Sequence, residues 1–279
     1  AAARAHGAEI RCGAAVARIQ VVNGRASGVV LRDGSEIAAS RVVSSAEPRH
    51  TLLTLADPLQ LDPEFVRAVR HIRFRGVTAR VHLALGELPR FRGMNGDAAL
   101  GSTISIAPHL DYVEQAYDDA KHGGVSGQLC LEANIPSLLD PGVSPAGRHA
   151  MSISVQYAPY RLNGAGWNAA AREALADAAI ATLAEYAPEL PGAILDRRVL
   201  SPADIEEHYG APEGSLEHGE ITLDQILFMR PVPGWAHYRT PVHGLFLCGA
   251  GTHPGGRVAG GGGRLAAAAM ARDKVNASA

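Results

Sequence analysis

The glycine-rich segment near the carboxyl end constrains the fold more than any other feature of this sequence. Residues 249–263 contain eight glycines and lie between the apolar run Leu245–Cys248 and an alanine-rich stretch predicted to be helical from about Arg264 to Arg272. Glycine lets a backbone approach a bulky ligand closely. The helix that follows presents unpaired N–H groups and a partial positive charge. This order predicts a site for an anionic or electron-rich ligand, and a surface loop without a ligand stays the alternative.

Short β-branched runs separated by turn dipeptides fill the first part of the chain. The runs are Val16–Val22, Ser27–Leu31 and Glu36–Val43. Asn23-Gly24 and Asp33-Gly34 separate them, and both dipeptides accept the positive φ values of a type I′ turn. The pattern predicts a meander of two hairpins.

The middle of the chain alternates between strand and helix patterns. Apolar residues at every second position predict a strand from Val77 to Leu85 with one buried face. Capping and periodicity predict the other elements. In chain order these are a helix capped by Asp62, a helix begun by an Asp111/Glu114 capping box and ended at Gly123-Gly124, strands Leu129–Ala133 and Ser152–Tyr157, a helix from Asn168 to Tyr186, and a helix from Ser201-Pro202 to near Gly210.

Charge and cysteine usage exclude several classes of protein. The chain has 26 Lys plus Arg against 28 Asp plus Glu, so its formal net charge is −2, and it has no long basic run. This composition argues against nucleic acid as a partner. No run approaches the roughly 18 apolar residues of a membrane span, so no transmembrane segment is expected, while peripheral membrane contact stays open. Cys12, Cys130 and Cys248 form neither a disulfide framework nor a CxxC site, which fits a reducing, cytoplasmic setting.

A scatter of His and Glu residues precedes the last strand. His208, Glu217, His218 and Glu220 lie close in sequence without an HExxH pattern or compact helical spacing. No metal site is therefore predicted, and these side chains are expected at the surface.

The amino-acid sequences of the glycine-rich segment and of the meander resemble those of a known family. The C-terminal flavin motif of the phytoene desaturase-like FAD oxidoreductases, within the flavin amine oxidase superfamily, is strongly similar to Cys248-Gly249-Ala250-Gly251-Thr252-His253-Pro254-Gly255-Gly256 with Val258, Gly260 and Gly263-Arg264. The FAD-domain meander of that family resembles Gly28-Val29-Val30-Leu31 and Val42-Val43-Ser44-Ser45-Ala46 here, and its approach to the final strand resembles Arg230-Pro231.

The resemblance implies an α/β (α+β) two-domain flavoprotein. Residues 1–47 and 236–279 would belong to a partial FAD/NAD(P)-binding domain of the Rossmann type, and residues 48–235 to a substrate domain built on a mixed sheet. The family's opening GxGxxG turn is not in this sequence, so the chain is expected to be roughly the C-terminal half of such a protein.

FAD is the cofactor that the resemblance implies. Residues 249–251 would pass near the pyrophosphate and ribityl chain, and residues 257–260 would lie at the isoalloxazine ring, where the amides of Val258 and Ala259 face its N1–C2=O edge. Arg257 stands where relatives commonly carry glycine, and Ala250 where amine oxidases carry an acidic residue. The implied cofactor-binding residues are Val16, Gly249, Ala250, Gly251, Thr252, His253, Gly255, Gly256, Arg257, Val258, Ala259 and Gly260.

The functional hypothesis is hydride transfer from an apolar or amphipathic small molecule to flavin. The chemistry belongs to the flavin, so no catalytic side chain is assigned. Two alternatives stay open: a catalytically silent scaffold or binding relative without flavin, and a flavin amine oxidase acting on C–N bonds. The chain by itself is expected to be inactive, and the sequence leaves its oligomeric state open.

Overall fold

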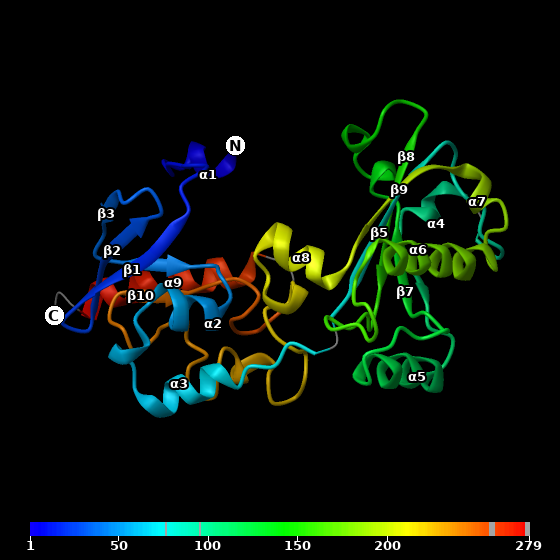
Figure 1. The fold of residues 1–279 in the computed structure, drawn as a ribbon. Coiled ribbons are helices and arrows are strands. Elements are labelled where there is room, and N and C mark those ends of the chain that lie inside the picture. Colours follow the sequence, from blue (N-terminus) through cyan, green and yellow to red (C-terminus); the bar gives the residue numbers. More distant parts are fainter. Residues whose placement is uncertain (76, 95, 257–259, 277–279) are drawn as a thin grey trace. The chain divides into compact units, whose positions relative to one another are not determined.

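The chain divides into two compact units. The computed structural model describes residues 1–75, 77–94, 96–256 and 260–276 (Figure 1). Unit 1 comprises Ala1–Arg73 together with Leu216–Ala279, and unit 2 comprises Phe74–Ser215. The predicted domain roles, with boundaries after residues 47 and 235, stay a prediction. Among the described helices, none is long and apolar enough to cross a bilayer.

Unit 1 contains the predicted meander. Strands β1 (Val16–Val22), β2 (Arg25–Leu31) and β3 (Glu36–Ala38) form an antiparallel sheet in that order. Asn23 and Gly24, between β1 and β2, have φ values of 51° and 71°, the positive values that the dipeptide favours in a tight turn.

The predicted strand Glu36–Val43 is wrong as one element, because the chain changes sheets within it. The Ala39 amide bonds to the Ser27 carbonyl at 3.0 Å, and the Val42 amide bonds to the Gly244 carbonyl at 2.8 Å. Strand β4 (Val42–Ser44) therefore leaves the meander and pairs in parallel with β10 (Leu245–Leu247).

The last helix of unit 1 begins earlier than predicted. Helix α9 spans Gly261–Asn276, so three glycines form its first turn ahead of Arg264. Helix α3 begins after Asp62 as predicted, and the Asp62 carboxylate accepts from the Glu64 amide at 2.8 Å. The remaining helical elements are α1 (Ala2–Ala5), α2 (Pro48–His50), the π-helical turn η1 (Thr51–Leu55), α3 (Pro63–Arg70), and the 3₁₀ turns η2 (Pro58–Gln60) and η6 (Leu227–Met229).

Unit 2 is built on a five-stranded sheet in the order β6-β7-β8-β5-β9. Every neighbouring pair is antiparallel, which corrects the prediction of a mixed sheet. Helix α6 (Ala169–Ala184) lies between β8 and β9 in the chain, but these strands flank β5 on opposite sides and so never pair. The strands are β5 (Ala79–Leu85), β6 (Ile104–Ile106), β7 (Leu131–Asn134), β8 (His149–Val155) and β9 (Ile194–Leu200).

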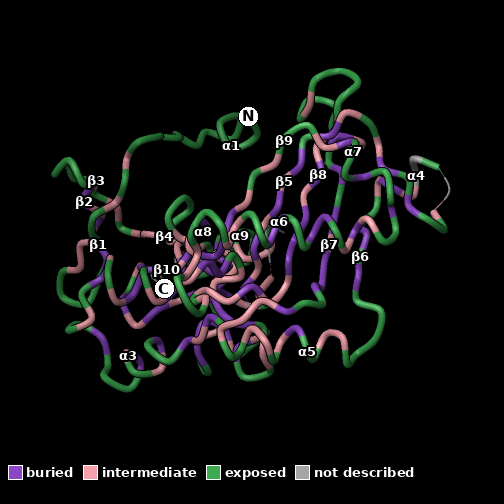
Figure 2. The backbone as a smooth tube through the Cα atoms, turned by 45° about the vertical axis from the view of Figure 1, so that its right-hand side comes forward, coloured by how far each residue is buried: buried purple, intermediate pink, exposed green. Residues whose placement is uncertain are grey.

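One face of this sheet packs against α6 to form the core of unit 2 (Figures 1 and 2). Val81 and Leu83 of β5 are buried with Ile153 of β8, as the period-2 pattern predicts, and they cluster with Leu183 of α6. Tyr186, predicted on the same helical face, lies beyond the helix and is 40% exposed.

Helix α5 (Leu110–Lys121) has a different N-cap from the predicted one. The His109 ring Nδ1 accepts from the Tyr112 amide at 3.1 Å, so His109 replaces the Asp111 capping box. The other helical elements of unit 2 are α4 (Asp97–Leu100), η3 (Pro136–Leu138), η4 (Pro141–Val143), α7 (Leu190–Ala193), α8 (Pro202–Tyr209) and η5 (Pro212–Gly214).

Helix α8 carries the predicted cap, strengthened by an ion pair. The Ser201 hydroxyl accepts from the Asp204 amide, and the Asp204 carboxylate accepts from the Ser201 amide. Arg172 donates to both oxygens of the same carboxylate, at 2.6 and 2.8 Å. The Arg172 guanidinium is the main cause that lowers the pKa of Asp204 to about 2.

Asp204→Asn is expected to lower the free energy of unfolding by about 2 kcal/mol at neutral pH. The folded pKa lies below the unfolded value of 3.8, so the stabilisation is present above 3.8 and is lost as the pH falls through about 2. Urea unfolding of both proteins at pH 7 and pH 2 measures this. A difference between them that is as large at pH 2 as at pH 7 would contradict the linkage.

Candidate functional site

The candidate site begins at the parallel pair of β4 and β10. Parallel strands end at the same edge, and open α/β sheets bind ligands at the carboxyl ends of their strands. At this edge the Cys248 amide bonds to the Ser44 carbonyl at 2.8 Å. A Cβ atom on Gly249 would lie 3.1 Å from the Ser45 carbonyl oxygen. The loops that follow the two strands therefore meet at the edge.

The glycine-rich segment forms a compact turn directly after β10. Gly249 adopts φ +85°, in the left-handed region that favours glycine. Thr252 is 1% exposed, and its hydroxyl donates to the Gly249 carbonyl at 2.9 Å. The Gly255 amide then bonds to the Thr252 carbonyl at 2.6 Å. Local hydrogen bonds thus fix the backbone of residues 249–255.

The start of α9 packs directly on this turn. A Cβ atom on Gly262 would lie 2.9 Å from both the amide nitrogen and the carbonyl oxygen of Gly249, and 3.0 Å from the Thr252 hydroxyl. Only glycine allows such an approach without a shift of the backbone. The unpaired N–H groups and partial positive charge of the α9 N-terminus therefore lie beside the turn.

A buried arginine ties the turn to a second loop, residues 217–225. Arg230 is 3% exposed, and among the described residues its guanidinium group donates only to backbone carbonyl oxygens. One Nη1 bond reaches Ala250 at 2.6 Å, in the glycine-rich turn. Burial lowers the pKa of Arg230 from its ordinary value. The other bonds reach Gln225 at 2.6 Å, Glu217 at 2.5 Å, Gly219 at 2.9 Å and Glu220 at 3.2 Å.

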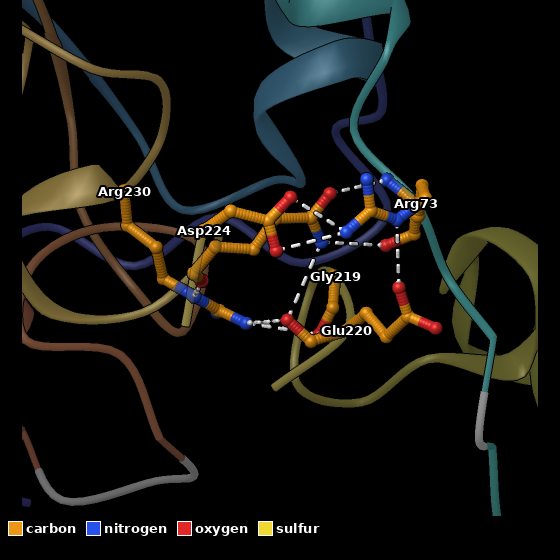
Figure 3. A network of polar contacts seen from close by, with 6 residues as sticks. Arg73, Gly219, Glu220, Asp224 and Arg230 are labelled. Carbon is orange, nitrogen blue, oxygen red and sulfur yellow. Dashed lines mark hydrogen bonds and ion pairs between the residues drawn. The ribbon is translucent and has the colours of Figure 1, made fainter. Parts of the chain in front are cut away.

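A second arginine holds the other side of the 217–225 loop (Figure 3). The Nε atom of Arg73 lies 3.0 Å from a carboxylate oxygen of Glu220, whose side chain is 7% exposed. The Nη2 atom of Arg73 lies 2.7 Å from Asp224. The buried positive charge of Arg230 and the outer ion pairs of Arg73 therefore fix the loop from two sides.

Two histidines at the site carry buried ring nitrogens. The Nδ1 atoms of His218 and His253 have no hydrogen-bond partner among the described residues. The Cβ atom of His218 would lie 3.2 Å from a Cβ atom on Gly251. Burial, and secondarily the charge of Arg230, lowers the pKa of His218, which favours the neutral ring. Buried polar atoms normally have partners, so these two are suited to a ligand.

Among the described residues, the structure brings several of the predicted loop residues together and leaves others apart. Gly249, Ala250, Thr252 and Gly255 contact one another or Arg230. A Cβ atom on Gly251 would instead meet Pro48 and His218. The His253 carbonyl accepts from the Tyr238 hydroxyl at 2.9 Å, and Gly256 and Gly260 have positive φ values with open space where a Cβ atom would lie. Val16 lies at the start of β1, in a different sheet. The predicted residues Arg257, Val258 and Ala259 are outside the described residues.

Sequence reasoning missed three residues of this site. In the sequence, Arg230 was noted only as part of the resemblance, although the nearby residues Met229 and Val232 are apolar and are consistent with burial. The predicted surface placement of His218 and Glu220 is wrong, because the His218 Nδ1 is buried and Glu220 is 8% exposed. Among the described residues, no group of three or more His, Cys, Asp or Glu side chains could hold a metal ion.

Comparisons with known proteins identify a family and several similar proteins. A family model described as flavin containing amine oxidoreductase matches residues 1–271. Pyridine nucleotide-disulfide oxidoreductase domain-containing protein 2 of Rattus norvegicus is 38% identical, over 98% of this chain and 49% of that protein. The lycopene-forming phytoene desaturase of a Paracoccus species is 28% identical, over 91% of this chain and 48% of that protein.

A solved structure shares the fold. The crystal structure of an oxidoreductase from Methanosarcina mazei superposes with a TM-score of 0.55 at 17% identity, over 96% of this chain and 51% of that one. The coverage values of the two curated relatives show that this chain spans about half of their length.

Proposed function

The chain belongs to the family of flavin-containing amine oxidoreductases, and we propose that it is the part of an FAD-dependent oxidoreductase that holds the flavin through the glycine-rich segment. Family membership points to FAD as the cofactor. The reaction proposed for the whole protein is hydride transfer from a carbon–hydrogen bond of an apolar or amphipathic organic substrate to flavin. The 28% identity to a phytoene desaturase supports this type of substrate.

The residues of the site fit an FAD molecule. The single observation that carries the proposal is the glycine-only contact between the α9 N-terminus and the turn after β10, where a Cβ atom on Gly262 would lie 2.9 Å from Gly249 backbone atoms. The unpartnered Nδ1 atoms of His218 and His253 add hydrogen-bonding capacity at the same place. The residues proposed to hold the cofactor are Gly249, Ala250, Gly251, Thr252, His253, Gly255, Gly256 and Gly260, with Val16, Arg257, Val258 and Ala259 retained from the resemblance.

The charges at the site favour an electron-rich ligand. Flavin, when bound, supplies the hydride acceptor. The protein contributes the positive end of the α9 dipole and the buried charge of Arg230, whose guanidinium is held 2.6 Å from the Ala250 carbonyl. The lowered pKa of His218 keeps its ring neutral, so it offers a hydrogen bond rather than a charge. These groups orient and stabilise the ligand, and no side chain is assigned to move a proton.

We propose that unit 2 supplies the substrate-binding part of the protein. Its sheet and α6 form a separate core, which leaves unit 1 to hold the cofactor. The sequence placed the substrate domain at 48–235, whereas the compact unit is Phe74–Ser215.

A full-length protein that includes a GxGxxG dinucleotide-binding turn is expected to purify yellow, with near-stoichiometric FAD, because such a turn binds the pyrophosphate of the cofactor. Flavin absorbance of the released cofactor, relative to protein, measures the content. A colourless full-length protein would favour the scaffold alternative. Reduction of the bound flavin by primary or secondary amines, but not by polyenes, would favour action on C–N bonds.

A further inference from the structure

A cavity in unit 2 is not used by the proposed flavin chemistry. It has a volume of about 210 Å³ and lies between the end of α5 and the chain that leaves β8. Tyr117 of α5 lines it together with Tyr157 and Tyr160, which follow β8. Three aromatic side chains on one small cavity are suited to a ring-shaped ligand.

The tyrosines are held in place by the surrounding backbone. The rings of Tyr117 and Tyr157 meet edge to face, with centroids 5.7 Å apart and planes at 77°. Tyr157 has φ +58°, which is uncommon for a bulky residue and recurs at ligand-binding sites. The next residue, Ala158, bonds through its amide to the Val77 carbonyl at 3.1 Å. Two neighbouring strand ends therefore fix the conformation that places Tyr157 beside Tyr117.

Two of the three tyrosines have hydroxyl groups that are available for hydrogen bonds to a ligand. Tyr160 donates to the Glu206 carboxylate. Among the described residues, the hydroxyls of Tyr117 and Tyr157 have no hydrogen-bond partner. Burial raises the pKa of Tyr157, so its phenol stays protonated and able to donate at neutral pH.

The charges on the lining select the ligand's charge. Arg75, Lys121 and Arg161 line the cavity against the single carboxylate of Glu213. Arg161 is exposed and forms no ion pair with any residue that the structure describes. The Nζ atom of Lys121 lies 4.0 Å from Asp118, the limit of an ion pair. This positive balance attracts an anion and repels an amine.

We propose that this cavity binds a planar aromatic anion. Its ring would lie among Tyr117, Tyr157 and Tyr160, and its carboxylate or other anionic group would face Arg161 and Lys121. The site lies within unit 2, so the proposal does not depend on flavin.

Titration calorimetry on the full-length flavoprotein tests the proposal with three matched probes: 1-naphthoate, 1-naphthamide and 1-naphthylmethylamine. The naphthoate is expected to bind most tightly. Arg161→Gln should weaken its binding about tenfold or more, since a charge-assisted hydrogen bond is lost. Tyr157→Phe should weaken it by a smaller factor. Arg90→Gln, at an exposed arginine outside the cavity, should match the wild type.

The proposal is overturned if naphthoate does not bind, if the amine binds as tightly as the naphthoate, or if Arg161→Gln behaves like Arg90→Gln. Flavin content is measured in each preparation and is expected to be equal in all of them. A flavin-free protein that still binds naphthoate with this pattern would refute the proposed function and support the cavity.

Discussion

Arg230→Met is expected to lower the free energy of unfolding by at least about 4 kcal/mol and to abolish flavin retention in the full-length protein. The substitution removes a buried guanidinium that bonds to the carbonyls of Ala250, Gly219 and other residues of the 217–225 loop. Each buried acceptor left unpaired costs about 1–3 kcal/mol, and partial hydration recovers some of that loss. The turn after β10 also loses the hydrogen bond from this side chain to the Ala250 carbonyl.

Arg73→Met is the matched control for this prediction. The Arg73 side chain is 41% exposed, and ion pairs at such positions contribute about 1 kcal/mol or less. Its loss should lower stability and flavin content less than the loss of Arg230 does, because the Arg230 bonds to the 217–225 loop and to Ala250 remain. Arg230→Lys, which keeps the charge but not the planar set of donors, should fold with an intermediate loss. Urea unfolding measures the free energy of unfolding, and flavin absorbance measures the flavin content. Equal effects of Arg230→Met and Arg73→Met would contradict the prediction that the buried arginine contributes more than the exposed one.

Gly263→Ala is expected to raise stability, whereas Gly262→Ala is expected to leave it unchanged or to lower it. Alanine in place of a helical glycine is favourable by about 1 kcal/mol. A Cβ atom on Gly263 meets nothing within 4 Å, so this variant should gain most of that amount. A Cβ atom on Gly262 would lie 2.9 Å from backbone atoms of Gly249, and overpacking of this kind costs about 1–3 kcal/mol. The clash therefore cancels or exceeds the helical gain at Gly262.

Thermal unfolding of the two variants beside the wild type measures this contrast. Gly263→Ala should raise the melting temperature, and Gly262→Ala should fail to raise it or should lower it. A similar rise in both variants would mean that the α9 N-terminus does not press on the turn after β10 in solution.

Elements set by neighbouring residues could be predicted from the sequence. The turn at Asn23-Gly24, the Asp62 cap and the Ser201/Asp204 capping box each depend on residues within three positions. The alternation along β5 also predicted its buried face, because one side of the sheet packs on α6.

Features set by distant parts of the chain could not be predicted in this way. The β-branched run that contains β4 looked like a third meander strand, but its partner is β10, about two hundred residues away. The burial of His218 and Arg230 likewise depends on packing against the glycine-rich turn and the 217–225 loop. The sequence showed that the glycine-rich turn resembles a flavin motif, but it did not show which distant side chains support the turn.

The affinity of the flavin-free full-length protein for added FAD, compared between Gly262→Ala and Gly263→Ala, tests most directly whether this turn holds the cofactor. Quenching of FAD fluorescence on binding supplies the dissociation constant. Gly263→Ala should bind FAD as the wild type does, whereas Gly262→Ala should bind about tenfold more weakly or worse, because Gly249 and Thr252 must shift to admit the added Cβ atom. Wild-type affinity in both variants would contradict the account.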